Sequence, residues 1–143
     1  MSTDGRILIV EDQREWQIEI KHLLKDFPYA IKIANGFQKA HDYLTHHVFN
    51  LVLLDLRLND WEEGNFDGWN LIQMIAQARK EQGTQVIIIS AYGDTEIVRE
   101  GFKEYSLCDY LDKKRFTPIE FQEAVIGAIE KAFFERKEII DTL

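Results

Sequence analysis

The chain has 143 residues, 45% of them hydrophobic and 29% charged, with a formal net charge of −8. This size predicts a single globular domain over residues 1–143 with a core of its own, and the single cysteine, Cys108, excludes an internal disulfide. The acidic balance argues against direct binding to nucleic acid or to an anionic membrane surface, because both need a basic face. The sequence contains no secretion-signal pattern and no apolar stretch long enough to span a bilayer, so we expect a cytoplasmic protein.

Short aliphatic runs mark the predicted strands. Residues 7–10, 51–54 and 86–89 are almost purely aliphatic, which is typical of strands that are buried on both faces of a parallel sheet. A more mixed run at residues 30–34 predicts a strand nearer the edge of the sheet. A brief run at residues 109–111 predicts a fifth strand.

Helical patterns alternate with these runs. Apolar residues recur at helical spacing after each of the first four runs, over residues 16–27, 37–48, 71–78 and 97–105. Thr117, Pro118 and Glu120 form the start signal of a last helix, a capping box with proline at the first helical position. The alternation predicts an α/β fold, a doubly wound five-stranded parallel sheet with five helices.

The residues that directly follow the strands carry the chemistry. In a doubly wound sheet, ligands bind outside the carboxyl ends of the strands, so these residues are expected to meet at one rim. They are Glu11, Asp12, Asp55, Ser90 and Lys113. Clustered carboxylates repel one another and call for a cation, and hard oxygen ligands suit Mg²⁺. A carboxylate can also act as a nucleophile toward phosphorus, so the pattern favours phosphoryl transfer.

These motifs resemble the response-regulator receiver domains of two-component systems, over roughly residues 6–129. The matching segments are residues 7–12, 51–55, 86–91 and 109–113. The resemblance implies the flavodoxin-like strand order 2-1-3-4-5. It also implies that Glu11 and Asp12 bind Mg²⁺ together with Asp55, the phosphoacceptor, and with the backbone carbonyl of Arg57.

The same resemblance implies a conformational switch. The Ser90 hydroxyl moves toward the phosphoryl group, Ala91 leaves that group room, Lys113 pairs with it, and Tyr110 turns inward. A histidine kinase or phosphotransfer protein is the implied donor, and a downstream protein or output domain is the implied reader. The protein is then a phosphoacceptor that assists its own phosphorylation and dephosphorylation, not an enzyme acting on another substrate. From its bulk near the phosphoryl group, Tyr92 is expected to slow hydrolysis.

Two features depart from the family pattern. Lys114 stands where the family usually has a proline after a cis peptide bond, so the peptide after Lys113 is either trans or strained, and Lys114 is a second candidate for its role. The loop over residues 56–66 is longer than usual, lacks proline and carries extra acidic residues. Both features leave open the alternative that the chain is a pseudo-receiver, which acts only as a protein-interaction domain.

Other interpretations are weaker. A phosphatase with an aspartate nucleophile needs an acid two residues after Asp55, where this chain has Arg57. A nucleotide- or flavin-binding domain needs a phosphate cradle after the first strand, where Glu11 and Asp12 would repel phosphate. Asp12, with Glu15 three residues later, also fits a helix cap.

The last helix is predicted to continue past the domain, with residues 130–143 as a possible extension. One apolar stripe should cover the sheet and a second should remain exposed, which favours a homodimer contact or a link to another domain over a frayed polar tail. The covering stripe is Phe121, Val125, Ala128 and Ala132. The exposed stripe is Ile126, Ile129, Phe133, Ile140 and Leu143.

Overall fold

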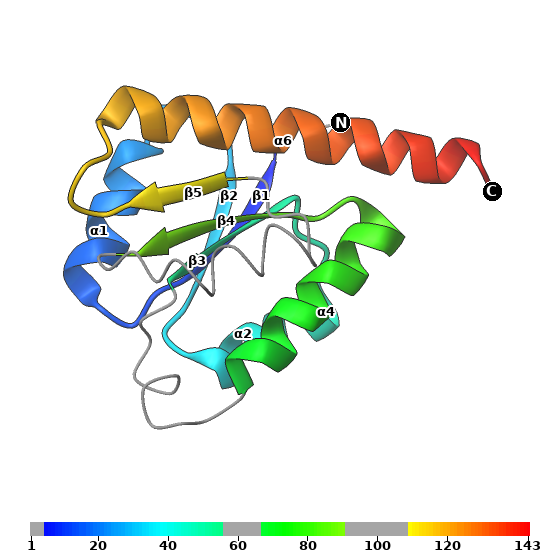
Figure 1. The fold of residues 1–143 in the computed structure, drawn as a ribbon, viewed down its shortest axis with the longest axis horizontal. Helices are drawn as coiled ribbons and strands as arrows, with labels where there is room; N and C mark the ends of the chain where they lie inside the picture. The colour runs from blue at the N-terminus through cyan, green and yellow to red at the C-terminus, as the bar shows by residue number, and fades with distance from the viewer. Residues whose placement is uncertain (1–4, 56–66, 91–108) are drawn as a thin grey trace.

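The structure is a computed structural model that describes residues 5–55, 67–90 and 109–143 (Figure 1). Its centre is one sheet of five parallel strands in the order β2-β1-β3-β4-β5, which confirms the predicted fold class and strand order. The strands are β1 (Arg6–Val10), β2 (Ala30–Ala34), β3 (Leu51–Asp55), β4 (Gln85–Ser90) and β5 (Asp109–Asp112).

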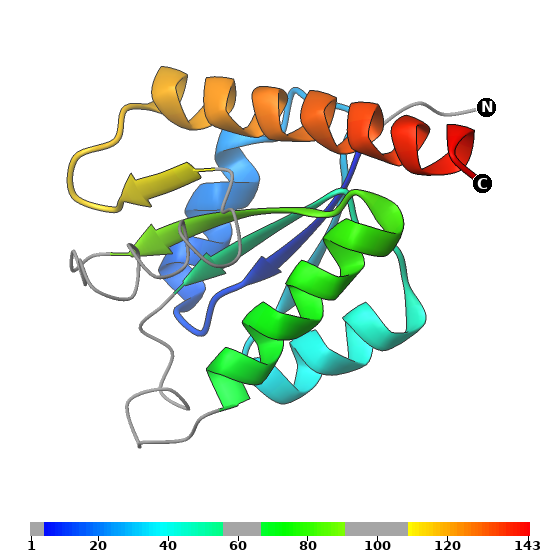
Figure 2. The ribbon, with the colours of Figure 1, turned by 45° about the vertical axis from the view of Figure 1, so that its right-hand side comes forward.

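Four helices in the described part of the chain cover the sheet. They are α1 (Arg14–Leu23), α2 (Phe37–His46), α4 (Asp67–Gln82) and α6 (Pro118–Asp141). α1 and α6 lie on one face of the sheet and α2 and α4 on the other (Figures 1 and 2). The helix expected over residues 97–105 lies outside the described residues. None of the described helices is both long and apolar enough to cross a membrane.

Each strand packs against a helical layer on both of its faces, and this explains why the aliphatic runs have no polar positions. Successive side chains of a strand point to opposite faces. In β1, Leu8 and Val10 face the layer of α2 and α4, while Ile7 and Ile9 face the layer of α1 and α6. Each run is therefore apolar at every position, as expected for strands covered on both sides.

Parallel register brings the ends of the strands to one rim. Val10 pairs with Leu54, Asp55 pairs with Ile89 in β4, and Ser90 pairs with Asp112. The residues that follow β1 and β5 therefore lie beside the last residues of β3 and β4. This alignment positions the candidate site.

The last helix begins as predicted. The Thr117 hydroxyl accepts a hydrogen bond from the Glu120 N–H at 3.1 Å, with Pro118 at the first helical position. The predicted covering stripe is buried, but the prediction that Ile129 is exposed was wrong, because Ile129 is only 5% exposed. Ile129 packs against Gly5, which has no side chain to hold it away, and a Cβ added at Gly5 would lie 2.6 Å from the Ile129 Cδ1.

Candidate metal centre

Three carboxylates converge at the carboxyl rim of the sheet. Glu11 and Asp12 follow β1, and Asp55 is the last residue of β3. Each of the three offers an oxygen that lies within 4.8 Å of the other two. Glu11 and Asp55 are only 1% and 4% exposed, so most of this negative charge is shielded from water. The geometry brings together the acidic set that the sequence predicted.

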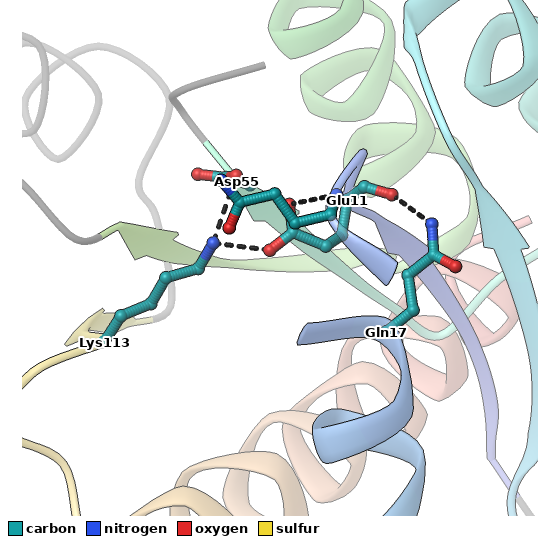
Figure 3. Close-up of polar contacts among 5 residues, drawn as sticks. Glu11, Gln17, Asp55 and Lys113 are labelled. Atoms are coloured by element: carbon teal, nitrogen blue, oxygen red, sulfur yellow. Dashed lines mark hydrogen bonds and ion pairs between the residues drawn. The ribbon is translucent and has the colours of Figure 1, made fainter. Parts of the chain in front are cut away.

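A lysine lies against two of these carboxylates. The Lys113 ammonium donates to Oε1 of Glu11 and, at 3.2 Å, to Oδ2 of Asp55 (Figure 3). Lys113 is only 8% exposed, and its backbone N–H donates to the carbonyl of Ser90 at 2.9 Å. Because a buried charge is stable only when it is paired, this ion network compensates part of the cost of burying the carboxylates.

The turn after β5 explains how Lys113 reaches the site without the family's proline. The peptide between Lys113 and Lys114 is trans. The Asp112 carboxylate accepts the Lys114 N–H at 2.9 Å, and the Asp112 carbonyl accepts the N–H groups of Arg115 and Phe116, both at 3.0 Å. This tight turn directs Lys113 inward and leaves Lys114 exposed, so Lys114 does not occupy the site.

The Glu11 backbone is fixed from two sides. Its N–H donates to the Ala34 carbonyl at 3.0 Å, and its carbonyl accepts the side-chain amide of Gln17 at 2.7 Å (Figure 3). Gln17 is not one of the predicted site residues, and its only signal in the sequence is a polar side chain one turn into α1. Gln13 is the N-cap of α1, so the alternative that Asp12 caps this helix is wrong.

The site perturbs the acidity of Glu11. Burial, together with the hydrogen bond and charge of Asp55, raises the pKa of the Glu11 carboxyl to about 8, although Lys113 opposes this rise. The Glu11 carboxyl therefore holds its proton more tightly than a solvent-exposed glutamate does. Because a carboxylate must lose its proton to bind a cation, metal binding at this site is linked to pH.

Other predicted residues are placed less completely. Ser90 is fully buried at the end of β4. Tyr110 lies in β5, packs against the core on the α2 and α4 face, and has a buried hydroxyl. Arg57, Ala91 and Tyr92 lie outside the described residues.

The comparisons with known proteins agree on one family. The family model described as "Response regulator receiver domain" matches residues 7–126. The response regulator ArlR of Staphylococcus haemolyticus is 31% identical over 138 residues, which cover 94% of this chain and 56% of ArlR. The chain spans between 22% and 49% of the length of the first curated relatives it matches.

Solved structures share the fold. The signal receiver domain of a putative Luxo repressor protein from Vibrio parahaemolyticus superposes with a TM-score of 0.77 at 26% identity, covering 92% of this chain and 95% of that domain. The receiver domain of a sensor histidine kinase from Pseudomonas aeruginosa has a TM-score of 0.70 at 23% identity, covering 90% and 99% of the two chains. That structure has a magnesium ion coordinated in its active site cleft.

Proposed function

The chain belongs to the family of response regulator receiver domains, and on that premise we propose that it is phosphorylated on Asp55 in a Mg²⁺-dependent reaction. The observation that carries the proposal is the contact of one buried lysine with two of three clustered carboxylates. This arrangement combines a nucleophile, a candidate cation site and a positive charge at a single rim.

The donor set fits Mg²⁺. Glu11, Asp12 and Asp55 supply only oxygen atoms, which are the ligands this ion prefers, and they lie close enough together to share it. The magnesium ion in the cleft of the Pseudomonas aeruginosa domain supports the assignment. Bound Mg²⁺ would supply charge neutralisation for the carboxylates and the incoming phosphoryl group. The Arg57 carbonyl is proposed as a further ligand.

The chemistry of the chain's own residues follows from their positions. An Asp55 oxygen attacks the phosphorus of a phosphohistidine donor, forming an O–P bond as the P–N bond breaks and the imidazole leaves. The Lys113 ammonium, already 3.2 Å from Asp55, pairs with a phosphoryl oxygen, and the Ser90 hydroxyl donates to another. The product is an acyl phosphate on Asp55, so the protein acts as a phosphoacceptor.

The partners follow from this reaction. A histidine kinase or phosphotransfer protein would supply the phosphoryl group, and a downstream protein or output domain would read the change in shape. Ser90 moving toward the phosphate and Tyr110 turning inward would alter the surface near β5. Ala91 and Tyr92 are proposed to set the space and water access around the phosphoryl group.

Acetyl phosphate with Mg²⁺ tests the proposal. Intact-mass spectrometry should detect one added phosphoryl group that hydroxylamine removes, as expected for an acyl phosphate. Asp55→Asn should abolish the addition. The matched control Asp109→Asn, a carboxylate at the opposite end of β5, should be labelled like the wild type. Labelling of Asp55→Asn would refute the assigned acceptor, and an unlabelled wild type that folds normally would favour the pseudo-receiver.

A further inference from the structure

We propose that Trp16 is a positioning residue that holds the Lys113 ammonium at the phosphorylation site. The inference rests on the proposed function and assigns a role to a residue of α1 that is not one of the predicted site residues. The ammonium nitrogen of Lys113 lies 4.9 Å from the centroid of the Trp16 ring. This distance is within the range of about 6 Å in which an aromatic face attracts a cation.

The Trp16 ring and two carboxylates contact the same Lys113 ammonium. An ammonium has three N–H donors, and Lys113 directs hydrogen bonds to Glu11 and Asp55. Among the residues that the structure describes, Trp16 is a third group in contact with it. The indole is therefore part of the wall that surrounds the charge, and it is supplied by a different element from those that carry the carboxylates.

The Trp16 ring is itself connected to the core. Its centroid lies 6.2 Å from that of Phe116, in the turn that carries Lys113, and Phe116 lies 5.6 Å from Phe121. Phe121 lies in the first turn of α6 and is fully buried. This row of three rings joins α1 to the turn after β5 and to α6. A ring supported in this way can restrain a long and flexible lysine side chain.

The restraint matters because one carboxylate partner of Lys113, Asp55, changes during the proposed reaction. Phosphorylation converts the Asp55 carboxylate to an acyl phosphate, whereas the Trp16 ring keeps its attraction for the ammonium. Lys113, Trp16 and Phe116 line one pocket together with Glu15 and Glu19. Without the indole, these two exposed carboxylates would compete for Lys113 and draw it away from the phosphoryl group.

Two substitutions of Trp16 distinguish the effect of an aromatic ring from the effect of side-chain size. With acetyl phosphate and saturating Mg²⁺, Trp16→Leu should lower the phosphorylation rate by about fivefold to tenfold, and Trp16→Phe should restore most of it. Phe27→Leu is the matched control, because Phe27 stacks on Tyr29 at 5.5 Å beyond the other end of α1. It should leave the rate unchanged even where it lowers thermal stability as much as Trp16→Leu does.

Fluorescence tests the contact directly. In the variant Trp61→Phe/Trp69→Phe, Trp16 is the only tryptophan, and its emission should shift when Lys113→Met removes the ammonium. Equal phosphorylation rates for wild type and Trp16→Leu would overturn this inference alone, as would an emission spectrum unchanged by Lys113→Met. A wild type that accepts no phosphoryl group would overturn the proposed function and this inference with it.

Discussion

Arg79 of α4 and Glu135 of α6 form a two-point ion pair, with Nε–Oε1 and Nη2–Oε2 distances that are both 2.9 Å. The two helices cover opposite faces of the sheet and meet beyond the amino end of β4, where α6 passes the end of α4 (Figure 2). The pair therefore ties the two helical layers together. It also shows that the segment around Glu135 packs on the domain, which contradicts the alternative of a frayed tail.

The first prediction concerns the strength of this pair. The hydrogen bond from Arg79 lowers the pKa of Glu135 below its usual value. Stability from a lowered carboxyl pKa is present above the unfolded-state pKa and is lost as pH falls through the folded-state pKa. At pH 7, Glu135→Gln should cost about 0.5–1.5 kcal/mol of unfolding free energy, since the pair is bidentate and partly buried.

Urea denaturation of Glu135→Gln over a pH series measures this effect. The difference from wild type should shrink as pH falls from about 6 toward 3. Glu138→Gln, on the exposed face of the same helix, is the control and should change stability little. A constant difference across the series would mean that the charge of Glu135 is not what stabilises the contact.

The second prediction compares two glycines. Gly83 has φ of +82°, and a Cβ there would lie 2.7 Å from the Ala132 carbonyl oxygen and 2.8 Å from the Arg136 nitrogen. Gly83→Ala should therefore destabilise the fold by about 2–4 kcal/mol. An alanine is strained at this positive φ, and its Cβ would clash with the backbone of α6.

Gly127 provides the opposite case within α6. A Cβ at Gly127 would have no heavy atom within 4 Å, so Gly127→Ala should stabilise the protein by about 0.5–1 kcal/mol through helix propensity. Thermal unfolding of both variants tests the pair. If the two substitutions had similar effects, the close approach of α6 to Gly83 would be wrong.

The fold could be predicted because its determinants are local. Strands covered on both faces have to be apolar throughout, and parallel order brings the residues after each strand to one rim. The structure accordingly places Glu11, Asp12, Asp55 and Lys113 together.

Contacts between distant elements were not predictable in the same way. A helical period allows more than one apolar stripe on α6, and the burial of Ile129 involves a contact with Gly5, which is far away in the sequence. Trp16 looked like an ordinary member of an apolar stripe, although its ring also faces an ammonium. Arg79 and Glu135 are 56 positions apart, and no pattern in the sequence pairs them.

The third prediction follows from the raised pKa of Glu11. Because the carboxyl must lose its proton to bind a cation, Mg²⁺ affinity should rise as pH increases toward 8, by up to about tenfold per unit. Glu11→Gln should bind Mg²⁺ more weakly and with little dependence on pH. Calorimetric titration at several pH values checks both results, and Glu19→Gln, an exposed carboxylate of α1, should behave like the wild type.

Without metal, the Glu11 carboxyl should make the fold less stable as pH rises, whereas it should make Mg²⁺ binding stronger. A raised carboxyl pKa contributes stability that is complete below the unfolded-state value of 4.5 and is lost as pH rises through about 8. Glu11→Gln keeps a neutral side chain, so its stability relative to wild type should increase over this interval. A Mg²⁺ affinity of the wild type that is flat from pH 6 to 8 would contradict the assigned proton.

The last prediction concerns self-association through α6. Ile126, Phe133 and Ile140 follow one another at seven-residue spacing; Ile126 is half-buried, Phe133 is 37% exposed and Ile140 is 56% exposed. Phe134 adds a side chain that is 64% exposed. Because burying such a row removes apolar surface from water, we expect a homodimer in which two α6 helices pack together.

Light scattering over a concentration series measures the mass of the assembly. Ile140→Glu should shift the protein toward the single chain, because a carboxylate at the contact would be desolvated without a partner. Ile18→Glu is a matched control, since Ile18 is 58% exposed but lies on α1. It should leave association unchanged because Ile18 is not part of the exposed row on α6. A mass of one chain at every concentration, or equal disruption by both substitutions, would assign the exposed row to another partner.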